Sequence, residues 1–165
     1  MDTLKNLRDE LTEEYNTTKK FLNNFPIGKN EYAPHKKSMK LMDLTTHIVD
    51  IFGWPPLILK SDFLEFTDGY LPDKMNDKAA LQAQLDKQYT AGIHALEAAK
   101  EDDLKPNWSI QMNGQKIMEW SKYGAIRHGL NQITHHRAQL GVYYRLLDIP
   151  VPGSYGPSAD ENSGM

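Results

Sequence analysis

The stretch HGLNQITHHRAQL, residues 128–140, combines a helical repeat of apolar side chains with three histidines and two glutamines. Each residue of an α-helix advances by about 100° around the axis, so angles measured from Gln132 show which side chains share a face. The main apolar residues fall between about +20° and +100°, which centres the apolar face near +60°. They are Ile133, Leu140, Tyr143 and Leu147. The stretch therefore predicts an amphipathic helix.

Several polar side chains of this helix lie on or near its apolar face. His136, at about +40°, lies inside the face, whereas Gln132 and Gln139, at about −20°, lie at its edge. His135 falls on one flank, at about −60°, and Arg137, at about +140°, is expected to point away from the core. Because Gln132 and His136 are one turn apart, their side chains can approach a common point in the interior.

The same periodicity extends along most of the chain. Apolar residues at three- and four-residue spacing predict helices over residues 3–25, 38–52, 77–99 and 121–147. Pro26 ends the first of these helices, and the sequence GWPP, residues 53–56, is interpreted as the terminator of the second. Residues 59–76 contain turn residues and little periodicity, which predicts a long irregular connection.

One short segment has the pattern of β-structure. In NWSIQMNGQKIMEW, residues 107–120, Asn113-Gly114 separates two short alternating runs, which predicts a β-hairpin that leans on the helices. Residues 153–165 are expected to form an irregular tail. Taken together, the patterns predict an all-α fold in one domain, residues 1–165: a four-helix bundle with a small β-hairpin before the last helix.

Composition narrows the class of protein. The 165 residues carry a net charge of −3 with scattered lysines, which argues against nucleic acid as a partner. The absence of cysteine excludes disulfides, zinc-thiolate sites and a cysteine nucleophile, so any metal must be held by nitrogen and oxygen. The charged amino-terminal segment lacks a signal-peptide core and no apolar run is long enough for a membrane span, so we expect a cytoplasmic protein that does not enter a membrane.

A second histidine shares a buried face with apolar neighbours. On the helix predicted over residues 38–52, His47 lies on the side of Leu44 and Ile51, whereas Thr45 and Val49 are expected on the far side. Buried polar groups need partners, so His47, Gln132 and His136 can converge on one cation. A histidine on an apolar face is more often a hydrogen-bonded core residue than a ligand, so both interpretations stay open.

Two segments resemble a known family. They are APHKKSMKLMDLTTHIVDIFGW, residues 33–54, and LNQITHHRAQLGVYYRLLDIPVPGSYGPSADE, residues 130–161, and together they resemble the DinB/YfiT superfamily of metalloenzymes. The resemblance implies a bundle in up-down-down-up order. It also implies a zinc or nickel ion held by one histidine on the second helix and two histidines one turn apart on the last.

By that pattern His47 corresponds to the first ligand and His136 to the third, but Gln132 stands where the second histidine is expected. Two histidines and an amide oxygen can hold a metal more weakly, favour a harder cation, or mark a site that has lost its ion. His135 is an alternative ligand, although its angle puts it on the flank.

The resemblance also implies a function. Relatives include thiol-dependent enzymes, namely a mycothiol-dependent maleylpyruvate isomerase and bacillithiol S-transferases. We therefore expect a metal-dependent thiol S-transferase or hydrolase that acts on a small molecule, with a low-molecular-weight thiol as cofactor and a homodimeric assembly. The alternative is a metal-free, catalytically silent module for small-molecule binding or protein interaction, in which Gln132 marks the lost ligand.

Other residues are candidates for the lining of a pocket. Trp54 and Tyr143 are interpreted mainly as packing residues that can also border the site, and Gln139 and His135 lie beside His136. Tyr155 belongs to the segment YGPSADE, which is expected to fold back over the bundle and close a pocket.

Overall fold

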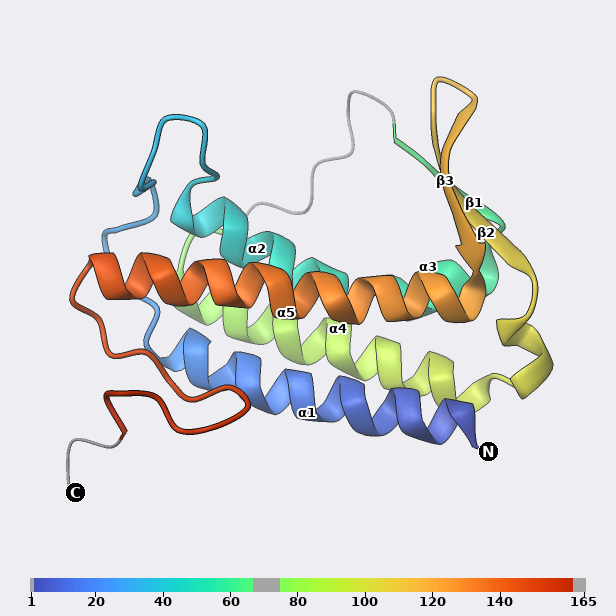
Figure 1. The fold of residues 1–165 in the computed structure, drawn as a ribbon, viewed down its shortest axis with the longest axis horizontal. Helices are drawn as coiled ribbons and strands as arrows, with labels where there is room; N and C mark the ends of the chain where they lie inside the picture. Colours follow the sequence, from blue (N-terminus) through green and yellow to red (C-terminus); the bar gives the residue numbers. More distant parts are fainter. Residues whose placement is uncertain (1, 67–74, 162–165) are drawn as a thin grey trace.

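The computed structural model describes residues 2–66 and 75–161 (Figure 1). This part of the chain is mainly helical, with one small sheet. The helices are α1 (Thr3–Asn23), α2 (Leu41–Ile51), α3 (Trp54–Lys60), α4 (Lys78–Ala98) and α5 (Lys122–Leu146), with a 3₁₀ turn η1 (Glu101–Leu104). The strands are β1 (Phe63–Glu65), β2 (Asn107–Met112) and β3 (Gln115–Ser121).

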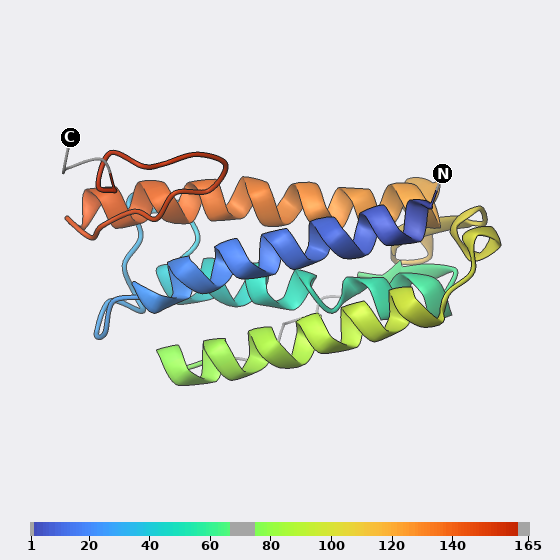
Figure 2. The same ribbon diagram turned by 90° about the horizontal axis from the view of Figure 1, so that it is seen from below.

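The long helices lie side by side and run in two opposite directions. Figures 1 and 2 show α1 and α5 running one way along the molecule, and α2, α3 and α4 running the other way. Helix α1 packs against α4 and α5, while α2 packs against α5 and α4. Within the described residues, no helix is both long enough and apolar enough to cross a membrane.

Three of the predicted helices are confirmed to within two residues at each end. Each of these three has a side-chain cap at its start: the side chains of Asp2, Asp77 and Ser121 accept hydrogen bonds from backbone N–H groups three residues later. Such caps satisfy donors that the first helical turn leaves without partners.

The second predicted helix, residues 38–52, is present as α2, and a further helix that was not predicted, α3, follows it. Helix α2 ends at Ile51, directly before Phe52 and Gly53, but Trp54 and the two prolines then occupy the first turn of α3. Proline is well tolerated there, since the first turn needs no backbone N–H donor and the ring fixes φ at a helical value. The interpretation of GWPP as a terminator was therefore correct about the break and wrong about the residues after it, which are helical.

The hairpin is confirmed, and the sheet is larger than predicted. Asn113 and Gly114 have φ angles of 52° and 73°, the two positive values that a type I′ hairpin turn needs. Strand β1, from the segment predicted to be irregular, pairs in parallel with β2 and gives the order β1-β2-β3. The sheet leans on the helices through Trp108, which is buried and donates to the Ser61 hydroxyl. Residues 67–74 of the predicted connection lie outside the described residues.

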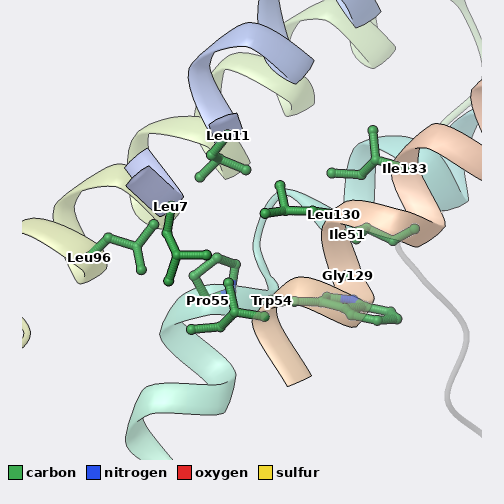
Figure 3. Close-up of a pocket in the computed structure, with 10 residues that line it drawn as sticks. Leu7, Leu11, Ile51, Trp54, Pro55, Leu96, Gly129, Leu130 and Ile133 are labelled. Atoms are coloured by element: carbon green, nitrogen blue, oxygen red, sulfur yellow. The ribbon is translucent and has the colours of Figure 1, made fainter. Parts of the chain in front are cut away.

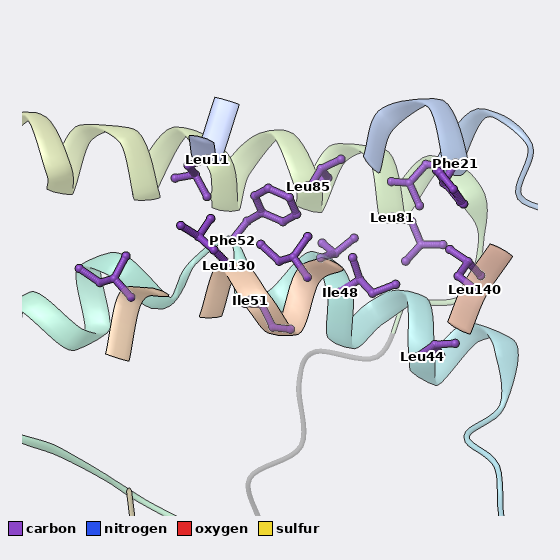
Figure 4. Packing of buried hydrophobic residues seen from close by; sticks show 14 of the residues in the cluster. Leu11, Phe21, Leu44, Ile48, Ile51, Phe52, Leu81, Leu85, Leu130 and Leu140 are labelled. Atoms are coloured by element: carbon purple, nitrogen blue, oxygen red, sulfur yellow. The ribbon is translucent and has the colours of Figure 1, made fainter. Parts of the chain in front are cut away.

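The core is formed by leucine, isoleucine and phenylalanine side chains that the helices share (Figure 4). Leu11 of α1, Ile48 of α2, Leu85 of α4 and Leu130 of α5 meet there. Helices α2 and α4 come close at Gly92, where an added Cβ would lie 2.6 Å from the carbonyl oxygen of Phe52. A side chain at position 92 would therefore push the two helices apart.

Helix α2 is buried on more than one side. Thr45 and Val49, predicted to lie on the far side from the core, are both 0% exposed, whereas His47 is only half-buried. The prediction of a single buried face was wrong because α2 packs against both α4 and α5. His47 consequently lies at the border between the core and solvent.

Arg137 does not point away from the core. It is 1% exposed, and its Nη1 atom lies 2.5 Å from Oε2 of Glu14, which is itself 5% exposed. The same nitrogen donates to the Thr18 hydroxyl at 3.2 Å. Because α5 also packs against α1, its buried face is wider than the apolar stripe indicates and includes this ion pair. A buried charge needs such a partner.

The carboxy-terminal segment folds back along α1 and α5 (Figure 2). The ring of Tyr155 is largely exposed, but its hydroxyl accepts from Arg137 at 3.0 Å and donates to Glu14 at 2.6 Å. Burial of this hydroxyl and its bond to Glu14 raise the pKa of Tyr155, so it stays protonated and able to donate. Further along, both oxygens of Asp160 accept hydrogen bonds from Arg145.

Replacing Arg137 with methionine should destabilise the fold by about 3–5 kcal/mol, because Glu14 is left buried without its counter-charge. Urea unfolding followed by circular dichroism measures this loss. The double variant Glu14→Leu, Arg137→Met should recover part of it, since no unpaired charge remains. A single variant as stable as the wild type would contradict the buried pair.

The variant Tyr155→Phe should lose about 1–3 kcal/mol of stability, because an oxygen of Glu14 loses its donor. Tyr123→Phe is the matched control, since that ring lies on the exposed side of α5. The same urea measurement applies to both. Equal stability of the two variants would mean that the Tyr155 hydroxyl does not contribute to the ion-pair network.

Candidate functional site

The packing of α2 against α5 brings two histidines together. The rings of His47 and His136 have centroids 4.8 Å apart and planes inclined at 72°. Both side chains are half-buried. Imidazole nitrogens bind zinc at about 2.0–2.1 Å, so two rings that share one ion must lie a few ångströms apart. They also must not lie parallel in a stack. The observed pair fits that requirement.

Burial favours the neutral form of both rings, which is the form that binds a metal. Burial, together with the positive charge that His136 would carry, lowers the pKa of His47, and Asp50 opposes this effect. Burial also lowers the pKa of His136, with a contribution from His135, while a hydrogen bond to Gln139 opposes it. A neutral imidazole has a free nitrogen lone pair, so the two rings can accept a cation near neutral pH.

Gln139 contacts the ring of His136 directly. The amide oxygen of Gln139 lies 2.9 Å from Nδ1 of His136, one turn earlier on the same helix. The oxygen can only accept, so this contact is a hydrogen bond in the tautomer that carries the proton on Nδ1 and the lone pair on Nε2. Sequence reasoning named Gln139 as a pocket residue without a role, although its three-residue spacing from His136 is a signal of side-chain contact on a helix.

Gln132 occupies the turn of α5 before His136 and is half-buried. Within residues 2–66 and 75–161, no three histidine or carboxylate side chains gather closely enough to hold a metal ion. Gln132 stays a candidate third donor by its position one turn before His136 on α5. An amide oxygen is a harder and weaker ligand than imidazole. A site with this third donor should therefore bind its cation with moderate affinity and favour harder cations.

Of the other predicted pocket residues, His135 and Trp54 lie beside the two histidines, whereas Tyr143 is a packing residue. His135 is exposed, with its ring centroid 5.0 Å from that of His136. Trp54, at the start of α3, presents its ring at 65° to His47 with centroids 6.2 Å apart. Tyr143 is buried and donates its hydroxyl to the Met39 carbonyl at 3.0 Å, so it serves packing.

Trp54 also borders a small apolar cavity (Figure 3). The cavity has a volume of about 10 Å³ and is lined by side chains from α1, α2, α4 and α5, among them Leu7, Ile51 and Leu130. That space is about one water molecule in size, so a substrate cannot occupy it. The indole nitrogen of Trp54 is buried and has no hydrogen-bond partner among the described residues.

Tyr155 lies at a different seam of the molecule. Its hydroxyl contacts Glu14 on α1 and Thr134 and Arg137 on α5, whereas His47 comes from α2. With Glu13, Glu14 and other residues of α1 it lines a depression of about 380 Å³. The structure thus places Tyr155 at the α1–α5 seam.

One aromatic contact of α5, away from the histidine pair, was not predicted. The ring of His128 stacks on Trp120 of β3, with centroids 4.7 Å apart, and burial lowers the pKa of His128. His128 and His136 are eight residues apart, or about 12 Å along α5, which is too far to share an ion. In the sequence, Trp120 directly precedes Ser121, the N-cap of α5, and this position lets its ring reach His128 on the same helix.

Comparisons with known proteins agree with this architecture. Three solved structures of DinB-like proteins are similar in fold to this chain. The protein from Bacillus cereus ATCC 10987 has a TM-score of 0.70 and 20% identity, over 90% of this chain and 95% of that chain. The protein from Exiguobacterium sibiricum 255-15 has a TM-score of 0.67 and 15% identity, over 90% and 93%. The protein from Bacillus subtilis has a TM-score of 0.66 and 16% identity, over 88% and 95%.

At these identities the structural matches establish the fold alone. No curated protein matches the sequence significantly. The model of the DinB family, in contrast, matches residues 1–163, nearly the whole chain. The chain is a member of the DinB family.

Proposed function

We propose that this protein is a metal-dependent enzyme in which His47 and His136 hold a divalent cation between α2 and α5. The observation that carries the proposal is the pair of half-buried imidazoles with centroids 4.8 Å apart, and burial, which lowers the pKa of both rings, supports it. Membership of the DinB family supports it. The proposal includes the family's four-helix bundle in up-down-down-up order. Helices α2 and α3 together form its second member, and α1, α4 and α5 form the first, third and fourth.

The reaction class is thiol S-transfer or hydrolysis of a small molecule. When bound, a divalent ion such as zinc or nickel would supply Lewis acidity and lower the pKa of a water or a thiol toward neutral pH. The chain contains no cysteine, so the thiol must come from the substrate or from a low-molecular-weight cofactor.

The side chains around the histidine pair have distinct roles in this proposal. Gln132 provides an amide oxygen as a weak third donor or as a group that orients water. Trp54 forms an apolar wall beside His47 and limits the access of water on that side. His135, exposed next to His136, can contact a substrate group. A homodimeric assembly, a cytoplasmic location and the absence of a nucleic-acid partner stay predictions.

A second candidate function follows from Gln132. If the glutamine marks a lost metal site, His47, Gln132 and His136 hydrogen-bond one another and the protein is a metal-free binding or interaction module. The replacement of the expected histidine by an amide is the observation that favours this candidate. Metal content separates the two functions.

Untagged protein purified without chelator should contain divalent metal at a near-stoichiometric level. Elemental analysis and calorimetric titration with zinc, nickel and manganese measure the content and the affinity. His136→Ala should abolish binding because it leaves one imidazole, whereas His94→Ala, on the exposed side of α4, should bind as the wild type does. Wild-type protein without bound metal at any concentration would refute the proposal.

The variant Gln132→His should bind zinc about tenfold more tightly or better, since even outer-shell changes alter affinity by about 10–100-fold. The same titration measures the gain. Binding by the variant but not by the parent would establish the metal-free module instead. Equal affinity of variant and parent would mean that position 132 does not face the ion.

A further inference from the structure

We propose that Gln139 is a positioning residue that fixes the tautomer of His136. Its amide oxygen accepts a hydrogen bond from the Nδ1–H group and so keeps the ring's lone pair on Nε2. The relevance of this lone pair for metal binding rests on the proposed function, but the tautomer itself is a property of the metal-free protein. A site that must receive a cation gains affinity when its ligand needs no proton shift or ring rotation before binding.

The geometry assigns this role to Gln139 in particular. The 2.9 Å contact joins its amide oxygen to Nδ1 across one helical turn, so both groups are carried by the same rigid element, α5. Gln139 is exposed, and its side chain fills no space in the core. A role in packing therefore does not account for the contact.

An amide differs in charge from a carboxylate, which is another common partner of a ligand histidine. A carboxylate would add a negative charge and favour the protonated imidazolium, which cannot bind a metal. An amide oxygen fixes the proton on Nδ1 without adding a charge. His136 is thus flanked by two amides with different roles: Gln132, one turn before it, as a donor to the ion, and Gln139, three residues after it, as the group that orients the ring.

The neighbouring rings make a defined tautomer important. The ring centroids of His47 and His135 lie 4.8 Å and 5.0 Å from that of His136, so imidazoles approach it from α2 and from α5. A neutral ring that is free in water favours the tautomer with its proton on Nε2. Without Gln139, the proton of His136 would therefore lie mainly on Nε2 and the lone pair on Nδ1.

The test is a long-range ¹H–¹⁵N imidazole spectrum of the metal-free protein above the pKa of its histidines. The wild type should show His136 with its proton on Nδ1, and Gln139→Ala should move it mainly to Nε2. Gln139→Glu keeps an acceptor at the position and should retain the Nδ1 proton. Gln84→Ala, on α4, is the matched control and should leave the His136 signals unchanged.

Zinc titration of the same variants provides the second readout. Gln139→Ala should weaken zinc binding by about 10–100-fold, with an unchanged unfolding midpoint in urea, because the side chain is exposed. A His136 tautomer that is Nε2–H in the wild type, or unchanged in Gln139→Ala, would overturn the inference. A wild type that binds no zinc but shows the Nδ1–H tautomer would refute the proposed function and leave the role of Gln139 supported.

Discussion

The ion pair in the core and the histidine pair both depend on the position of α5 between α1 and α2. On one side Arg137 enters a buried ion pair with Glu14 of α1, and on the other side His136 faces His47 of α2. Adjacent residues on a helix diverge by about 100°, so one rotational setting of α5 serves both contacts. Arg137 can reach Glu14 only in that rotational setting of α5. The same setting places His136 opposite His47.

The carboxy-terminal segment completes the seam between α1 and α5. Tyr155 shares the Arg137–Glu14 network, and Asp160 binds Arg145 on the last turn of α5. Glu161 folds the segment on itself by accepting from the backbone N–H groups of Gly153 and Ser158. These contacts cover one side of the helix and leave the α2 side to the histidine pair.

Periodicity and turn chemistry predicted most of the local structure, because they depend on residues close in sequence. The extents of α1, α4 and α5 and the Asn113-Gly114 hairpin follow from such signals. The errors arose where a helix has neighbours on two sides. A single apolar stripe placed Arg137, Thr45 and Val49 outside, whereas packing against a second helix buried all three.

The site was only partly predictable for a similar reason. Helix faces and the family resemblance selected His47 and His136, and the packing of α2 on α5 joins them. The bond between Gln139 and His136 depends on side-chain rotamers, and the approach of Trp54 to His47 depends on the break at Gly53. Neither feature is encoded in hydrophobic spacing.

The most direct measurement is an anomalous difference map from crystals of the protein grown with zinc, recorded above and below the zinc absorption edge. The account predicts one strong peak within bonding distance of ring nitrogens of both His47 and His136, with Nε2 as the ligand atom of His136. No peak at that position, or a peak bound to His135 without His47, would contradict it.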